Sequence, residues 1–191
     1  MTTQRLEAFS DGVLAIIITI MVLELKVPHG ADLHALRPVV PVFLAYVLSF
    51  IYVGIYWNNH HHLFQACEAV DGGVMWANLG LLFFLSLVPV VTAWVGDHPS
   101  APWPAAFYGI VLLLAGMAWT VLERALLARN PASPLARAVG ERWKEKISSL
   151  LYVLGIGLAF VRPWISLALY AVAALLWIVP DRRIERSLAS G

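Results

Sequence analysis

Residues 5–23 read RLEAFSDGVLAIIITIMVL, an apolar run that opens on the motif Arg5-x-x-x-Phe9-Ser10-Asp11. A helix needs about 20 apolar residues to cross the hydrocarbon core of a bilayer. The residues between Val13 and the turn at Pro28 are too few, so we expect the span to begin near Leu6. The hydroxyl and the carboxylate of the motif then lie inside the membrane.

Asp11 therefore has two interpretations. If the helix begins near Leu6, a carboxylate inside the membrane costs on the order of 3 kcal/mol and should face protein or water with a partner. If the helix begins later, Asp11 is solvated in the first turn, where the positive end of the helix dipole favours it. Spacing alone leaves both open.

The composition indicates a polytopic membrane protein. The 191 residues are 60% hydrophobic and 13% charged, and a soluble domain of this size cannot hide so much apolar surface. A single cysteine, Cys67, excludes a disulfide framework and a multi-cysteine metal site. The formal net charge of +1 argues against nucleic acid as a partner. The apolar run leads into Glu24 and Lys26 without a small-residue cleavage site, so we do not expect a cleaved signal peptide.

Apolar runs between helix breakers predict six spans within one domain, 1–191. The spans cover 6–25, 39–57, 74–95, 103–122, 147–161 and 163–179. The first four are long enough to cross alone. The last two are short, and Arg162-Pro163 between them reads as a tight turn of a helical hairpin; one long kinked segment is the alternative.

The placement of lysine and arginine predicts the orientation. With six spans and the N-terminus inside, ten of the thirteen basic residues are cytoplasmic. These ten are Arg5, Arg124, Arg129, Arg137, Arg142, Lys144, Lys146, Arg182, Arg183 and Arg186. This asymmetry obeys the positive-inside rule and predicts a multi-pass protein of the inner (plasma) membrane with both termini in the cytoplasm.

The first span also carries a stripe of apolar residues at helical spacing. Ile16, Ile20 and Leu23 are separated by four and three residues and therefore share one face, which Thr19 borders. Periodicity alone favours a packing face against neighbouring helices.

Polar residues cluster toward the predicted cytoplasmic ends of the next two spans. The second span ends in Trp57-Asn58-Asn59-His60-His61-His62, and the third contains Asn78. Successive helical residues point about 100° apart, so the three histidines cannot all bind one metal. One of them could instead meet Asp11, and such a pair would change its charge near neutral pH.

Known functional motifs are missing from the sequence. It contains no Thr-Val-Gly-Tyr-Gly filter, no Walker loop, no Gly-x-Ser-x-Gly elbow and no pair of inverted repeats. No catalytic constellation stands out, so we expect no enzyme activity, no cofactor and no bound metal.

The motifs resemble those of the lysosomal potassium-channel family (transmembrane protein 175 relatives) in its single-repeat prokaryotic branch. Arg5-x-x-x-Phe9-Ser10-Asp11 resembles the signature of the family's first helix, continued by Ala15-Ile16-x-x-Thr19-x-x-x-Leu23-Glu24-Leu25. Trp57-x-x-His60-His61 is similar to the end of its second helix, and Asn78 with Pro89 and Thr92 to its third.

The resemblance implies an all-α homotetramer with six membrane helices per subunit, whose first helices line a central potassium-permeable pore. It makes Ile16, Ile20 and Leu23 the pore constriction and Thr19 a neighbouring polar group. It also implies a structural polar network near the cytoplasmic mouth. That network comprises Arg5, Phe9, Ser10, Asp11, Trp57, His60, His61 and Asn78.

The implied function is a leak-type channel for potassium and other monovalent cations in a lipid bilayer. A ring of bulky apolar side chains closes a narrow pore by excluding water, and it offers no fixed oxygens for strict selectivity. The alternatives are a proton-coupled transporter that uses Asp11 and a histidine as the relay, and a non-conducting structural membrane protein.

Overall fold

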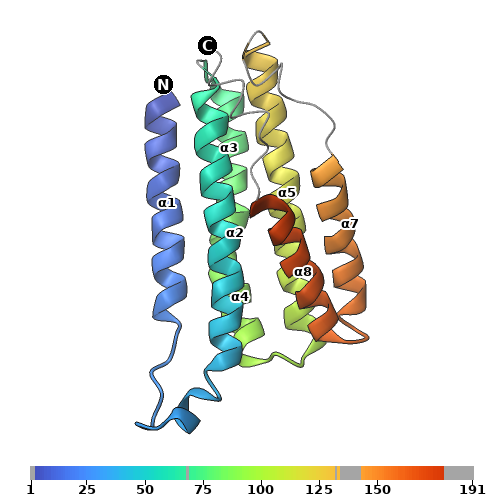
Figure 1. Ribbon diagram of the computed structural model, residues 1–191. Coiled ribbons are helices and arrows are strands. Elements are labelled where there is room, and N and C mark those ends of the chain that lie inside the picture. The colour runs from blue at the N-terminus through green and yellow to red at the C-terminus, as the bar shows by residue number, and fades with distance from the viewer. Residues whose placement is uncertain (1–2, 68, 132, 134–142, 179–191) are drawn as a thin grey trace.

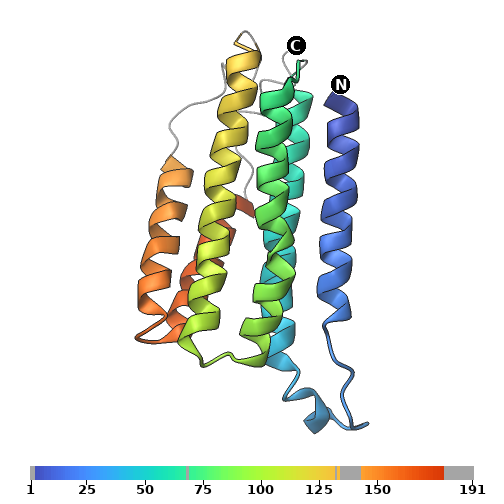
Figure 2. The ribbon, with the colours of Figure 1, turned by 180° about the vertical axis from the view of Figure 1, so that it is seen from behind.

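The computed structural model describes residues 3–67, 69–131, 133 and 143–178, which form helices and loops without a β-strand among them. The helices lie roughly side by side as one elongated bundle (Figures 1 and 2). In chain order they are α1 (Thr3–Leu23), a short 3-10 helix η1 (Leu33–Leu36), α2 (Val40–Gln65), α3 (Gly72–Ser86), α4 (Val88–Asp97), α5 (Pro102–Arg129), α7 (Trp143–Leu158) and α8 (Pro163–Ile178).

Four segments of the described chain are long and apolar enough to cross a membrane. They are α1, α2, the continuous segment Gly72–Asp97 made by α3 and α4, and α5. The helices α7 and α8 have 16 residues each and form an antiparallel hairpin beside α5 (Figure 1). The chain is thus an all-helical, multi-pass membrane protein, and the crossing of the membrane by α7 and α8 stays a prediction.

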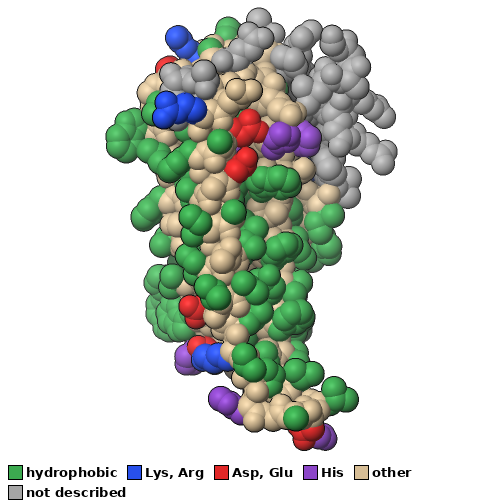
Figure 3. Space-filling model, turned by 90° about the vertical axis from the view of Figure 1, so that its left-hand side faces the viewer, with side chains coloured by type: hydrophobic (Ala, Val, Ile, Leu, Met, Phe, Trp, Pro, Cys, Tyr) green, Lys and Arg blue, Asp and Glu red, His purple; other side chains and the backbone are tan. Residues whose placement is uncertain are grey.

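The side-chain distribution fits this class. On the face beside α1, apolar side chains cover the middle of the molecule and charged side chains gather toward its two ends (Figure 3). Large apolar residues that water would disfavour are exposed along the bundle, such as Phe83, Val90 and Leu175. A surrounding bilayer makes this exposure favourable.

The helices differ from the predicted spans mainly in extent. The second helix continues to Gln65 rather than ending at residue 57, and the fourth continues to Arg129 rather than 122. Hydropathy marks only the part of a helix inside the membrane, whereas a helix continues until a breaker stops it. For α5 that breaker is Pro131, since the residue before a proline disfavours the helical region.

The third predicted span is interrupted near its middle, just before Pro89. Its α-helix ends at Ser86 and resumes at Val88. Pro89 has no backbone N–H to donate to the preceding turn and its ring crowds that turn. The hydroxyls of Ser86 and Thr92 donate to the carbonyls of Phe83 and Val88, which are carbonyls of their own helices.

Close packing joins the C-terminal hairpin to the bundle. The buried Tyr170 ring lies against Gly109 of α5 and Gly155 of α7, and a Cβ on either glycine would collide with that ring. The Tyr170 hydroxyl donates to the Ala105 carbonyl at 3.2 Å. Gly155 is thus a site of close helix packing. The expected turn at Arg162 is present, and α8 begins at Pro163.

Several residues that support the topology prediction lie outside the described residues. These are Arg137, Arg142, Arg182, Arg183 and Arg186, with position 179 of the last span.

Candidate functional site: the two faces of the first helix

Helix α1 divides into a buried face and an exposed face. Leu6, Ser10, Leu14, Ile17 and Met21 recur every three or four residues and are buried against α2, α3 and α4. Both ribbon views place α1 at one edge of the bundle, with α7 at the opposite edge (Figures 1 and 2). Within the described residues, the other face of α1 therefore has no helix over it.

The exposed face carries the predicted apolar stripe. Ile16 is 60% exposed, Ile20 43% and Leu23 76%. Thr19 is exposed beside them, and its hydroxyl donates to the Ala15 carbonyl at 2.8 Å. Within the described part of one subunit the stripe is not a packing face, because α2, α3 and α4 pack against the opposite side of α1.

A chain of buried hydrogen bonds joins the back of α1 to α2 and α3. The Ser10 hydroxyl donates to the Leu6 carbonyl at 2.8 Å, and the Asn78 side-chain amide donates to Ser10 Oγ at 2.9 Å. His60 Nε2 lies 2.8 Å from Asn78 Oδ1. Ser10, Asn78 and His60 are all at most 1% exposed. Buried polar groups inside a membrane protein need such partners.

The order of donors in this chain assigns the His60 tautomer. The Ser10 hydroxyl donates its only hydrogen to the Leu6 carbonyl, so Ser10 must accept from the Asn78 amide nitrogen. The Asn78 carbonyl oxygen then faces His60, whose Nε2 must be the donor. In the neutral ring Nδ1 carries no proton, and it is buried without a hydrogen-bond partner among the described residues.

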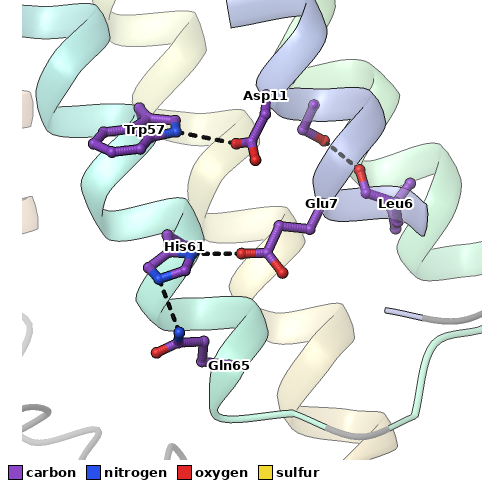
Figure 4. Close-up of polar contacts among 7 residues, drawn as sticks. Leu6, Glu7, Asp11, Trp57, His61 and Gln65 are labelled. Carbon is purple, nitrogen blue, oxygen red and sulfur yellow. Dashed lines mark hydrogen bonds and ion pairs between the residues drawn. The ribbon is translucent and has the colours of Figure 1, made fainter. Parts of the chain in front are cut away.

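A second, more exposed row of contacts joins α1 to α2 (Figure 4). Trp57 Nε1 donates to Asp11 Oδ1 at 3.1 Å, and His61 Nδ1 lies 2.5 Å from Glu7 Oε1. Gln65 Nε2 lies 2.8 Å from His61 Nε2. The contacting residues are spaced by four on each helix, so they form one ladder between two antiparallel helices.

The predicted network residues are brought together only in part. Ser10, Asp11, Trp57, His60, His61 and Asn78 make the contacts above. Arg5 and Phe9 are exposed and have no hydrogen bond or ion pair with the described part of the chain. The possible pairing of Asp11 with a histidine is not among the contacts of the described residues, because Asp11 accepts from Trp57 and the acidic partner of His61 is Glu7.

Glu7 was missed by sequence reasoning. The signal that could have found it is its position four residues before Asp11, on the same helix face. Within the described residues, no group of three His, Cys, Asp or Glu side chains is arranged to hold a metal ion.

Comparisons with known proteins identify the family. The family described as "Endosomal/lysosomal potassium channel TMEM175" matches residues 5–89, which include both rows of contacts on α1. A protein named "Potassium channel HX13_20290" from Chryseobacterium sp. is 55% identical over 98% of each chain. The chain belongs to the TMEM175 family. A second relative, named "Potassium channel B446_29190" from Streptomyces collinus, is 38% identical over 90% of this chain and 89% of its own.

A solved TMEM175 structure has the same fold. The crystal structure of a lysosomal potassium-selective channel TMEM175 homolog from Chamaesiphon minutus matches with a TM-score of 0.77 and 28% identity. The match covers 94% of this chain and 97% of that one. The TMEM175 family is one of ion channels, which agrees with the multi-pass helical architecture.

Proposed function

We propose that the chain is a potassium-permeable, leak-type cation channel that works as a homotetramer. The observation that carries the proposal is the exposed apolar stripe of Ile16, Ile20 and Leu23 on a helix that is fastened by polar contacts on its other side. The names of the related potassium channels and of the solved homolog support permeation of potassium. No feature of the described residues favours the proton-coupled transporter.

In this proposal four copies of α1 surround the pore. A single subunit exposes the stripe at its edge, and four such edges around a common axis would turn each residue of the stripe into a ring. Rings of isoleucine exclude water from a narrow pore, so ions pass when the rings widen slightly. Thr19 adds hydroxyl groups next to these rings.

The same proposal covers the membrane topology. Six crossings, with the α7–α8 hairpin as the last two, leave both termini in the cytoplasm of a cell whose inner (plasma) membrane holds the protein. Glu7, Asp11, Trp57, His60, His61 and Asn78 then lie toward the cytoplasmic mouth of the pore. Their role in this proposal is to position α1 rather than to contact ions.

Flux from potassium-loaded liposomes tests the channel. Purified protein should release potassium down its gradient with equal inside and outside pH, and native mass spectrometry should show four copies. Flux that requires a proton gradient would favour the transporter instead. Absence of flux from protein that is tetrameric and correctly inserted would favour the structural role.

A matched pair of variants tests the stripe. Ile16→Asn and Ile20→Asn should raise the potassium flux and lower the preference for potassium over sodium, because polar rings hold water in the constriction. Val90→Asn is the control, since Val90 is 66% exposed on α4 and does not belong to the stripe. Equal potassium fluxes in all three variants and the parent would show that the stripe does not line the pore.

A further inference from the structure

A hollow lies inside the bundle on the side of α2 that faces away from α1. It is lined by residues of α2, α5, α7 and α8, among them Tyr56, Trp119, Tyr152, Trp177, Asn59 and Glu145. Its volume is about 60 Å³, which is enough for several water molecules. No residue of α1 lines it, so it is separate from the proposed pore.

Aromatic rings make up much of the wall. Tyr56 of α2 meets Trp119 of α5 edge-on, with ring centres 6.0 Å apart. Tyr52 and Tyr152 lie 6.4 Å apart. The face of an aromatic ring carries the negative part of its quadrupole and attracts cations.

The polar groups of the wall include hydrogen-bond acceptors. The Asn59 amide nitrogen donates to the Ile55 carbonyl at 2.8 Å, so its carbonyl oxygen is left to accept. Glu145 is half-buried in the first turn of α7. Among the described residues that line the hollow, it is the one with a charged side chain. A carboxylate has about four lone-pair positions, so it can accept from a ligand in addition to its other contacts.

One ring of the wall, Trp177, already has a cation near it. Lys144, which does not line the hollow, holds its Nζ 5.9 Å from the centre of the Trp177 ring. The Trp177 indole N–H donates to Ser148 Oγ at 2.8 Å, which fixes the ring in place.

We propose that this hollow binds the protonated head of a small organic amine with an apolar body. The ammonium group would donate to Glu145 and Asn59, and the carbon atoms next to it would lie against the aromatic rings. The volume suits a group of about five heavy atoms, since each replaces roughly one water.

Three probes of one shape test the charge preference. n-Butylamine, 1-butanol and butanoate share a four-carbon chain and differ in charge at pH 7.5. Purified protein in detergent should show a saturable rise in melting temperature with n-butylamine, because a ligand that binds only the folded state stabilises it. An equal rise with 1-butanol would overturn the proposal in favour of an unspecific apolar cavity. A larger rise with butanoate would mean that the lysines of α7 select an anion.

Two variants test the location. Gly116 lines the hollow, and the nearest atom to a Cβ placed on it is the Tyr56 hydroxyl at 3.9 Å, so Gly116→Leu should fold and fill the space. We expect it to abolish the n-butylamine response. Gly157→Leu is the control, because Gly157 is exposed on α7 with nothing within 4 Å of a Cβ.

Glu145→Gln keeps the shape of the side chain and removes its charge. The dissociation constant for n-butylamine should rise about three- to fivefold, the effect of losing a partly exposed charge partner. An unchanged dissociation constant in both Gly116→Leu and Glu145→Gln would place n-butylamine elsewhere and refute the site. These measurements do not depend on ion flux, so their outcome is independent of the proposed channel function.

Discussion

The variant Asn78→Leu tests whether the buried hydrogen-bond chain holds α1 in place. Leucine removes the acceptor of His60 Nε2, which is 1% exposed and whose other ring nitrogen has no partner among the described residues. A buried donor without an acceptor costs about 1–3 kcal/mol. Ser10 still donates to the Leu6 carbonyl and so loses little. We expect Asn78→Leu to lower the free energy of unfolding by about 1–3 kcal/mol.

A double-mutant cycle isolates this contact. His60→Phe removes the imidazole and preserves a ring that can stack on Phe64, whose centre lies 4.4 Å from that of His60. In the Asn78→Leu background no acceptor remains for the histidine. His60→Phe should therefore lower the free energy of unfolding far less in that background than in the parent protein. The coupling energy should be about 1–2 kcal/mol, above the average of about 0.6 for hydrogen bonds between membrane helices, because both partners are fully buried.

The cycle can be measured by unfolding the purified protein in mixed micelles with a denaturing detergent, followed by near-ultraviolet circular dichroism. Ser86→Ala is the control on the same helix, since the exposed Ser86 hydroxyl donates to the Phe83 carbonyl of that helix. It should change the free energy of unfolding by less than about 0.5 kcal/mol. Additive single-variant effects, within about 0.3 kcal/mol, would show that His60 and Asn78 are not coupled and would refute the reasoning.

Three further predictions follow from local packing and charge. Gly155→Ala should lower the melting temperature because its Cβ collides with Tyr170, whereas the exposed Gly157→Ala should raise it by removing a helix glycine. Burial raises the pKa of the Cys67 thiol to about 11, so iodoacetamide should label folded protein slowly at pH 8 and faster only as the pH approaches 11; rapid labelling at pH 8 would contradict this. Glu7→Gln keeps an acceptor for its histidine partner and removes a partly exposed charge, so thermal unfolding should show a change below about 1 kcal/mol.

Hydropathy located the helices because a membrane span must hide its polar backbone within a continuous apolar run. It could not locate their ends. The helix through Asn58–Gln65 lies beyond the apolar run, and its extension depends on the absence of glycine and proline rather than on hydrophobicity. The interruption before Pro89 was predictable from proline chemistry alone, because the missing N–H acts locally.

The polar contacts were less predictable than the helices. Ser10 and Asn78 could be singled out because a polar side chain inside a membrane needs a partner. The identity of each partner depends on helix rotation and register, which the sequence alone does not reveal. That is why the sequence allowed a histidine as the partner of Asp11, whereas in the structure Trp57 contacts Asp11 and His61, one turn further along α2, contacts Glu7. Arg5 and Phe9 belong to the same motif, yet they lie on the exposed side of α1.

The distribution of contacts along α1 bears on how a channel of this kind would open. Glu7, Ser10 and Asp11 make all the side-chain hydrogen bonds and ion pairs that join α1 to another helix in the described structure, and they lie in its first half. The second half is held through Leu14, Ile17 and Met21, whose contacts are apolar and therefore have no preferred direction. A small tilt of this half about the fixed first half would break no hydrogen bond to a neighbouring helix. Because Ile16, Ile20 and Leu23 lie on this half, such a tilt would move them together and change the width of the proposed constriction.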